Sequence, residues 1–282
     1  ASDRYAALII KIMKNIITIL VLLLSLSTNA QVKLEKLWET KNLPTPESVL
    51  PDGNWLYVSL IDGGASEVDF KGGIALLNQS GMVVNKEWIK GLNAPKGMGI
   101  YKDIMYVADI NRVIKIDVKT ARILDRINID GAVFLNDIAI DAKGNVFVSD
   151  TRLNQIYRIV KDKPELYLEN IKSVNGLKTI KNDLFILSGP ELLKVDADKQ
   201  ITSIAKGLAA GGDGLEPLDN QTFLASCWAG LIYTIGLDGK VTQLLDTRAE
   251  AINTADIGYN PKLKILYVPT FLKNSVIAYQ VK

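Results

Sequence analysis

The sequence contains no histidine among its 282 residues. Serine–histidine–aspartate triads, cysteine–histidine dyads, zinc sites of the histidine type and histidine general bases are therefore excluded. Cysteine is almost as rare, because Cys227 is the only one and no internal disulfide can form. Without a histidine to activate it, we expect Cys227 to be a small buried residue and not a nucleophile.

The sequence also lacks an excess of charge of one sign. Residues 1–30 hold three of the 33 basic residues and one of the 31 acidic residues, which leaves 30 of each in residues 31–282. No cluster of lysine and arginine stands out along the chain. The sequence therefore gives no electrostatic argument for binding to nucleic acid or to an anionic membrane.

The start of the chain has the pattern of an export signal. A basic start at Met13-Lys14 precedes the apolar run IITILVLLLSL (16–26), which is too short to span a bilayer comfortably. The small residues of TNA (28–30) follow, as is typical of a signal-peptidase site. The pattern therefore predicts secretion across a membrane.

We expect cleavage after Ala30, so that residues 1–30 comprise upstream residues and a signal peptide and residues 31–282 form a single domain. One uncleaved anchor from about Ala6 to Leu26 is the alternative. No cysteine closely follows the apolar run, so attachment of a lipid is not expected. The predicted location is periplasmic or secreted, with no attachment to a membrane after cleavage.

From Val32 onward, apolar and polar residues alternate between turn residues, which is typical of an all-β protein. Six segments in this part of the chain resemble one another, as repeats do. They are PESVLPDGNWLYVSL (46–60), PKGMGIYKDIMYVAD (95–109), LNDIAIDAKGNVFVSD (135–150), VNGLKTIKNDLFILS (174–188), GGDGLEPLDNQTFLASCW (211–228) and ADIGYNPKLKILYVP (255–269).

Each segment has a polar residue ten or eleven positions before the aromatic residue of its second strand. These polar residues are Glu47, Lys96, Asn136, Asn175, Asp213 and Asp256. Intervals of 49, 40, 39, 38 and 43 residues separate them, which matches the period of four-stranded propeller blades.

The sequence therefore predicts a six-bladed β-propeller whose first strands line a central channel. The six polar residues, which we call the axial residues, would converge on this channel. Asp213 lies among the glycines of GGDGLEP (211–217), which permit backbones to approach one another closely. We predict that VKLEKLWET (32–40) pairs with SVIAYQV (275–281), so that the N- and C-terminal strands close the last blade.

The axial residues include three carboxylates and one ammonium, with a formal charge of −2 in a confined space. Carboxylates close together raise one another's pKa unless a cation neutralises them. Carboxylate and amide oxygens, with no thiolate or imidazole, favour calcium, and then magnesium or manganese, over zinc or copper. We therefore predict a divalent-cation site, with calcium as the first candidate.

Four motifs at blade spacing resemble those of the gluconolactonase, regucalcin and luciferin-regenerating-enzyme family. They are PES at Glu47, LND at Asn136, VNGL at Asn175 and GDGL at Asp213. The resemblance covers essentially all of residues 31–282, and related calcium propellers include the diisopropylfluorophosphatase and paraoxonase types. It implies a calcium-dependent propeller in which Glu47, Asn175 and Asp213 are direct metal ligands. Asn136 would be a further ligand or would lie at the substrate side.

The chain also departs from the family's pattern. Gluconolactonase-like members often carry an arginine shortly before the asparagine of the ND motif, whereas AVFLND here has Phe134 and Leu135. The resemblance therefore does not extend to specificity for sugar lactones. The histidine base of the paraoxonase type is absent, and Lys96 places a cation where some relatives are neutral.

If the site is catalytic, we expect metal-assisted hydrolysis of a lactone or related ester. Asp213 is the first candidate for the carboxylate that activates water, and Asp256 is the second. Lys96 would stabilise the developing oxyanion, or would weaken metal binding by repulsion. Asn136 is also a candidate for substrate binding, and Trp228 is either a core residue or part of the pocket wall.

Other polar residues of the repeats have structural explanations. Asp109 and Asp150 end second strands, where we expect them to cap loops, and a structural turn bond is expected for Asp137. The segment SEVDFKGG (66–73) lengthens the first repeat and is either a loop over the channel or a solvated hairpin.

The alternative function is that of an exported propeller without enzymatic activity. The segment PKGMGIYKDIMYVADINRVIKID (95–117) is also similar to NHL-type repeats, which would imply recognition of a peptide or glycan on the loop face. For the enzymatic hypothesis, we expect a small-molecule substrate and a monomeric protein. The two hypotheses differ in whether turnover of any ester depends on a bound cation.

Overall fold

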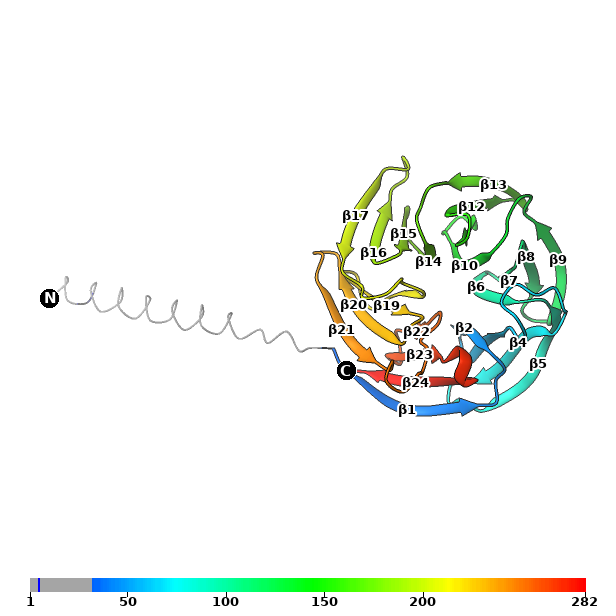
Figure 1. The fold of residues 1–282 in the computed structure, drawn as a ribbon, viewed down its shortest axis with the longest axis horizontal. Coiled ribbons are helices and arrows are strands. Elements are labelled where there is room, and N and C mark those ends of the chain that lie inside the picture. Colours follow the sequence, from blue (N-terminus) through cyan, green and yellow to red (C-terminus); the bar gives the residue numbers. More distant parts are fainter. Residues whose placement is uncertain (1–4, 6–31) are drawn as a thin grey trace. The chain divides into compact units, whose positions relative to one another are not determined.

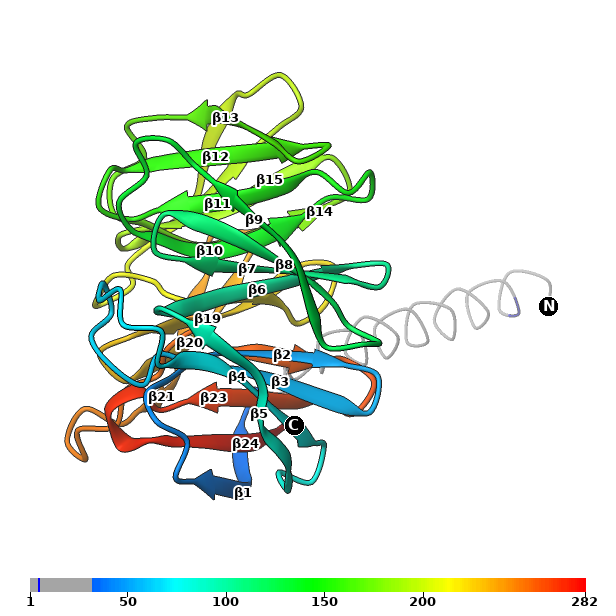
Figure 2. The same ribbon diagram turned by 90° about the vertical axis from the view of Figure 1, so that its right-hand side faces the viewer.

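The computed structural model describes Tyr5 and residues 32–282, and residues 33–282 form one compact unit. The predicted export signal lies outside the described residues. Within residues 32–282 the chain forms six four-stranded antiparallel sheets, arranged as the blades of a propeller around one axis (Figure 1, and from the side in Figure 2). The predicted all-β fold with six blades is therefore confirmed.

Blades 1 to 3 follow one another along the chain, each with its first strand at the axis and its fourth at the outside (Figure 1). Their strands are β2 (Pro46–Asp52), β3 (Trp55–Leu60), β4 (Gly72–Asn78) and β5 (Val83–Leu92) in blade 1, β6 (Pro95–Tyr101), β7 (Ile104–Asp109), β8 (Arg112–Asp117) and β9 (Arg122–Asn128) in blade 2, and β10 (Leu135–Ile140), β11 (Val146–Asp150), β12 (Gln155–Val160) and β13 (Lys163–Leu168) in blade 3.

Blades 4 to 6 repeat this order, except that the last blade takes its outer strand from the start of the propeller. Their strands are β14 (Val174–Ile180), β15 (Asp183–Ser188), β16 (Glu191–Val195) and β17 (Ile201–Lys206) in blade 4, β18 (Leu215–Pro217), β19 (Thr222–Cys227), β20 (Leu231–Gly236) and β21 (Val241–Asp246) in blade 5, and β22 (Gly258–Asn260), β23 (Ile265–Pro269), β24 (Ser275–Val281) and β1 (Leu34–Lys41) in blade 6. A 3-10 helix, η1 (Phe271–Lys273), joins β23 to β24.

The two terminal strands close the ring as predicted. β1 pairs antiparallel with β24 from Leu34 opposite Val281 to Lys41 opposite Ser275. This pairing covers the edge that each strand would otherwise expose, which removes a site for unwanted strand addition. The last blade therefore joins both ends of the described propeller in one sheet.

The hydrophobic core lies between neighbouring blades. One core cluster, for example, joins Tyr57 and Ile74 of blade 1 to Met98 and Met105 of blade 2. The aromatic residues of the repeats belong to these clusters, as the ring of Tyr57 lies 4.8 Å from that of Trp88. Burial of such large apolar side chains is the main force that holds the blades together.

Four of the six first strands, those of blades 1 to 4, share a local irregularity at the position of the axial residue. In blade 1, Pro46 pairs with Leu60 and Val49 pairs with Val58, so one extra residue of β2 lies between the pairs. The same register shift occurs in blades 2, 3 and 4. A β-bulge of this kind redirects side chains, and here it lies beside the axis.

Candidate functional site

The axial residues come from six blades but lie at one end of the propeller, where the first strands begin. Five of them are buried, with exposed fractions between 1 and 9%: Glu47, Lys96, Asn136, Asp213 and Asp256. Asn175 is half-buried. These side chains make few contacts with solvent, so their charges and hydrogen bonds depend on one another.

Glu47 and Asn175 each have one buried oxygen without a partner. Glu47 Oε2 and Asn175 Oδ1 receive no hydrogen bond within the described residues. The Nδ2 group of Asn175 donates to Asp213 Oδ1 at 2.8 Å, which turns the amide oxygen away from that carboxylate. A buried oxygen without a partner is costly, so the site needs a cation or a hydrogen-bond donor at this point.

The carboxylates at the axis have raised pKa values. Burial and then the charge of Asp256 raise the pKa of Asp213 to about 8. Burial raises the pKa of Asp256 to about 7, although a hydrogen bond from Ser48 opposes the shift. Burial, together with the charges of Asp213 and Asp256, also raises the pKa of Glu47 well above its usual value. The three carboxylates therefore lie close enough to repel one another.

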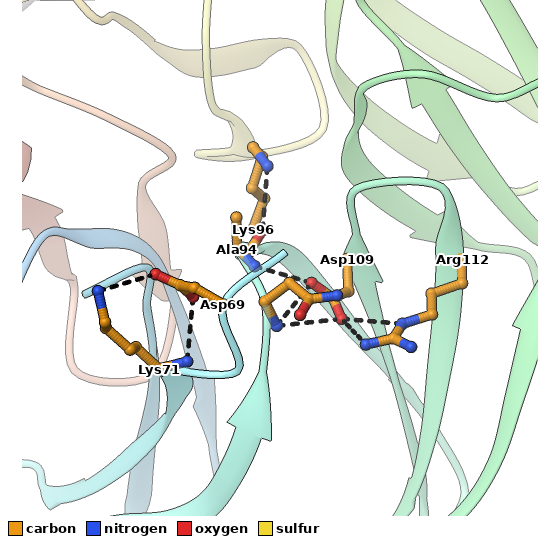
Figure 3. Close-up of polar contacts among 7 residues, drawn as sticks. Asp69, Lys71, Ala94, Lys96, Asp109 and Arg112 are labelled. Carbon is orange, nitrogen blue, oxygen red and sulfur yellow. Dashed lines mark hydrogen bonds and ion pairs between the residues drawn. The ribbon is translucent and has the colours of Figure 1, made fainter. Parts of the chain in front are cut away.

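Lys96 is an almost fully buried cation, with an exposed fraction of 1%. Its Nζ atom donates to the carbonyl oxygens of Ala94 and Ala65, both at 3.0 Å, and the first of these contacts is drawn in Figure 3. It forms no ion pair within 4.0 Å with any carboxylate of residues 32–282. Burial lowers its pKa to about 8, and the charge of Glu47 opposes this shift.

Further along the channel lies a second polar group, which we call the lower cluster: Ser48, Asp137, Lys178, Glu216 and Asp256. Ser48 Oγ donates to Asp256 Oδ2 at 2.5 Å, and Lys178 Nζ lies 2.7 Å from Glu216 Oε2. All five residues line one small cavity. Asp256 therefore belongs to the lower cluster as well as to the axial residues, whereas the sequence placed it only with the axial residues.

Asp137 has structural hydrogen bonds, as the sequence suggested, but they lie within β10 and between blades and not in a turn. Its carboxylate accepts hydrogen bonds from the backbone N–H groups of Leu177 in blade 4 and Ile138 in its own blade, both at 2.6 Å. The bond to Leu177 joins blades 3 and 4 at the axis. Burial and then the charge of Asp256 raise the pKa of Asp137, which shows that its carboxylate lies close to the other acidic groups of the channel.

Asn136 faces the rim of the site. Its Nδ2 group donates to Thr151 Oγ1 at 3.1 Å, and no hydrogen bond joins it to the other axial residues in the described chain. This position agrees with a role at the substrate side of the site. A role as a metal ligand requires its oxygen to point back towards Glu47 and Asp213.

An aromatic ring and two cations lie at the mouth of the site. Lys96 Nζ is 4.4 Å from the centroid of the Phe134 ring, and the guanidinium carbon of Arg152 is 4.5 Å from the same centroid. Arg152 also donates to Ser66 Oγ at 2.9 Å. The loop between β3 and β4 thus contacts both cations through Ala65 and Ser66, as a loop over the channel would.

Trp228 follows β19 at the same end of the blades as Asp213. Its side chain is 43% exposed, and its ring lies 5.6 Å from that of Phe271 in an edge-on arrangement. Trp228 is therefore not a core residue, and the prediction that it binds substrate stays a prediction. The neighbouring Cys227 is fully buried, and burial raises the pKa of its thiol to about 12, which makes it a poor nucleophile.

Sequence reasoning missed four residues of this region: Phe134, Arg152, Lys178 and Glu216. The sequence marks Phe134 only as a departure from the ND motif of gluconolactonase-like proteins. Lys178 and Glu216 each follow an axial residue by three positions in the repeat, and a comparison of these second polar positions would have found them. Arg152 lies in a loop, where spacing alone gives no direction for a side chain.

Within the part of the chain that the structure describes, no three histidine, cysteine, aspartate or glutamate side chains are arranged to hold a metal ion. The predicted calcium site would not form a group of this kind, because only two of its ligands, Glu47 and Asp213, are carboxylates and the others are asparagine oxygens. Among the described residues there is also no helix long and apolar enough to cross a membrane.

Solved structures of other propellers are similar to this chain, although no protein-family model and no curated protein matches its sequence. Virginiamycin B lyase from Staphylococcus aureus, in a catalytically inactive His→Ala variant with quinupristin, is 12% identical and has a TM-score of 0.64 over 89% of this chain and 99% of its own. A streptogramin B lyase is 12% identical, with a TM-score of 0.65 over 89% and 97%. A chain of a nidogen/laminin complex is 16% identical, with a TM-score of 0.62 over 74% and 86%. These similarities show the propeller fold, which serves both enzymes and binding proteins.

Proposed function

We propose that the protein is a hydrolase that uses a divalent cation, with calcium as the first candidate, to cleave a lactone or related ester. The observation that carries this proposal is the pair of buried oxygens without partners, Glu47 Oε2 and Asn175 Oδ1. Both belong to residues that the family resemblance implies as ligands. Hard oxygen donors of this kind suit calcium better than zinc or copper.

The balance of charge supports a bound cation. The axial residues, the lower cluster and Arg152 together include five carboxylates and three cations: Glu47, Asp137, Asp213, Glu216 and Asp256, against Lys96, Lys178 and Arg152. When all are ionised, two negative charges remain, and most of these groups are buried. One divalent cation would neutralise this excess and return the raised pKa values of the carboxylates towards their usual range.

Glu47, Asn175 and Asp213 would hold the cation, and Asn136 would be a further ligand or would bind substrate. When bound, the ion supplies Lewis acidity that polarises a carbonyl oxygen. Asp213 is placed by its hydrogen bond from Asn175 and would accept the proton of the attacking water. Lys96 is fixed by two carbonyl oxygens and would stabilise negative charge on the substrate oxygen.

Asp256 is a weaker candidate for the base. Its carboxylate accepts a hydrogen bond from Ser48 at 2.5 Å, within the lower cluster. We infer that its main effect is electrostatic, because its charge raises the pKa of Asp213. In this role it would keep Asp213 able to accept and release a proton near neutral pH.

The test combines binding with turnover. The chain from residue 31 onward, freed of metal by a chelator, should bind one calcium ion and gain thermal stability on addition of calcium. A panel of lactones, aryl esters and phosphotriesters should include a substrate whose hydrolysis the chelator abolishes. Glu47→Gln should lose both properties, whereas Asp130→Asn, a change of an exposed loop residue, should retain them. A protein that neither binds calcium nor hydrolyses any substrate would refute the proposal.

The second candidate is a propeller that binds a partner without catalysis. The similarity to a chain of the nidogen/laminin complex favours it, because that propeller belongs to a binding assembly. The similar lyases do not indicate a catalytic group for this chain, since virginiamycin B lyase is inactive in a histidine-to-alanine variant and this chain has no histidine. A binding propeller would show no turnover in the panel, with or without a cation.

We also propose that the protein works in the periplasm or outside the cell as a monomer. The pattern of residues 13–30 supports export, and the approximate balance of charge in residues 31–282 gives no reason to expect nucleic acid as a partner. Fractionation of cells that express the whole chain, followed by sequencing of the N-terminus of the product, tests the location.

A further inference from the structure

Blades 2 and 3 place the same residue at the end of the second strand. Asp109 and Asp150 are both fully buried. Asp109 accepts hydrogen bonds from the backbone N–H groups of Asn93 at 3.1 Å and Ala94 at 2.8 Å, in the connection that leads to its own first strand (Figure 3). Asp150 makes the same kind of contacts in blade 3.

Asp150 Oδ2 accepts from the N–H groups of Val133 at 2.7 Å and Phe134 at 3.1 Å. Its Oδ1 atom accepts from the N–H group of Leu153 at 3.1 Å. In both blades the carboxylate thus fixes the two residues that precede the first strand. The Phe134 ring is placed at the mouth of the candidate site by this contact.

The arginines next to these aspartates differ between the two blades. Arg112 lies three residues after Asp109, and its Nε and Nη2 atoms contact Asp109 Oδ2 at 3.1 and 2.9 Å, as Figure 3 shows. In blade 3 the arginine comes one position earlier, as Arg152, and Leu153 takes the third position. Arg152 forms no ion pair with any carboxylate of residues 32–282.

Arg152 instead extends over the mouth of the site. It is an exposed residue whose guanidinium lies against the Phe134 ring and contacts Ser66 Oγ. The ring also contacts Lys96, which has no carboxylate partner either. Two cations near one ring repel each other, and the charge of Arg152 indeed helps to lower the pKa of Lys96. An anion bound between solvent and Phe134 would relieve this repulsion.

We propose that Arg152 binds an anionic group of the substrate, a carboxylate or a phosphate, and so determines specificity at this site. This inference rests on the proposed function and names the class of substrate. The guanidinium has donors left over after its bond to Ser66, and a planar fork of donors matches the oxygens of either group. Phe134 and Ser66 restrict its motion, which lowers the entropy cost of binding.

The experiment compares two aryl esters of similar size, 4-nitrophenyl butyrate and the mono-4-nitrophenyl ester of succinate, which adds one carboxylate. A third ester, in which a phosphonate replaces the carboxylate of the succinate ester, distinguishes a site for a phosphate-like group from a site for a carboxylate. Arg152→Gln should lower kcat/KM for the anionic esters ten- to a hundredfold through KM and change it less than threefold for the butyrate. For the anionic esters, kcat/KM of Arg152→Lys should lie between that of the unaltered protein and that of Arg152→Gln. Arg126→Gln, a change of an exposed arginine on the outer strand β9, is the matched control and should affect neither ester.

Binding of succinate and of methylphosphonate, measured without turnover, separates this inference from the proposed function. Tenfold weaker binding to Arg152→Gln than to the unaltered protein supports the anion site even if no ester is hydrolysed. If esters are hydrolysed in a cation-dependent way but Arg152→Gln changes both kinds equally, the anion site is refuted and the hydrolase proposal stands. Equal binding of both anions to the two proteins would also refute it.

Discussion

Blades 2 and 3 have the same backbone arrangement at the axis and present different chemistry there. In blade 2, Pro95 pairs with Asp109 and Met98 with Val107, and blade 3 repeats this register with Leu135, Asp150, Ile138 and Val148. The residue within the bulge is nevertheless a lysine in one blade and an asparagine in the other. The bulge and the buried aspartate therefore determine the backbone arrangement of each blade. The residue inside the bulge, Lys96 or Asn136, and one loop residue, Arg112 or Arg152, determine which charges and hydrogen-bonding groups face the site.

The comparison is most severely tested by removing the two buried aspartates. Asp109→Ala leaves two backbone N–H groups and the largely buried Arg112 without a partner, so we expect a loss of about 4 kcal/mol in the free energy of unfolding. Asp150→Ala leaves three N–H groups but no buried cation, and we expect a loss of about 2 kcal/mol.

Unfolding in urea measures both losses, with the exposed Asp130→Ala as the control. Equal losses for the two variants would contradict the view that Asp109 forms a stabilising ion pair with Arg112 whereas Asp150 forms none with Arg152. A loss below about 1 kcal/mol for both would contradict their role in fixing the blade frame.

Blades 5 and 6 extend the comparison, because aspartates there replace the asparagine of blade 3. The pKa values of Asp213 and Asp256 in the folded protein, about 8 and about 7, lie above those of an unfolded chain. At these two groups the folded protein therefore binds more protons than the unfolded chain, so their contribution to stability is greatest below pH 4 and is lost as the pH rises through 7 and 8. We therefore expect the cation-free protein to unfold at a clearly lower temperature at pH 8 than at pH 5.

Calcium should restore most of this stability at pH 8, because a bound cation favours the ionised carboxylates. The double variant Asp213→Asn with Asp256→Asn makes these blades resemble blade 3 and should flatten the pH dependence. Thermal unfolding at pH 5 and pH 8, with and without calcium, provides the measurement. A stability that rises between these two pH values in the absence of a cation would show that the carboxylates are not mutually repelling.

A smaller effect is expected from Lys96→Asn, which gives blade 2 the axial residue of blade 3. Loss of a buried positive charge beside Glu47 should strengthen calcium binding about tenfold. The same change should lower kcat, because Lys96 would no longer stabilise negative charge on the substrate. Calorimetric titration with calcium and steady-state kinetics measure the two effects. Weaker calcium binding in this variant would mean that Lys96 helps to organise the site instead of competing with the ion.

The fold was predictable because every blade repeats one spacing. A polar residue ten or eleven positions before a strand aromatic lies beside the axis in each blade, and the aromatic residue packs in the core, so the same spacing locates both the core and the axis. The pairing of β1 with β24 was predictable as well, because an outer strand without its own first strand needs an edge to cover.

The site was predictable only to the level of which residues approach the axis. The direction of each side chain depends on local bonds, such as those of Asn136 to Thr151 and of Asp256 to Ser48, which no spacing reveals. Arg152 was missed for the same reason, since its direction depends on contacts with Phe134 and Ser66 from separate loops. Repeats define the frame, whereas loops define specificity.

The smallest expected effect comes from restoring the blade 2 spacing in blade 3. The double change Arg152→Leu with Leu153→Arg places arginine three residues after Asp150, as Arg112 follows Asp109. The new arginine should fold back onto Asp150 and raise the free energy of unfolding by about 0.5–1 kcal/mol. Binding of succinate should weaken as in Arg152→Gln, although the net charge is unchanged. If succinate binds as before, net charge at the mouth and not the position of Arg152 attracts the anion, and the single-residue difference between the two blades would have no functional meaning.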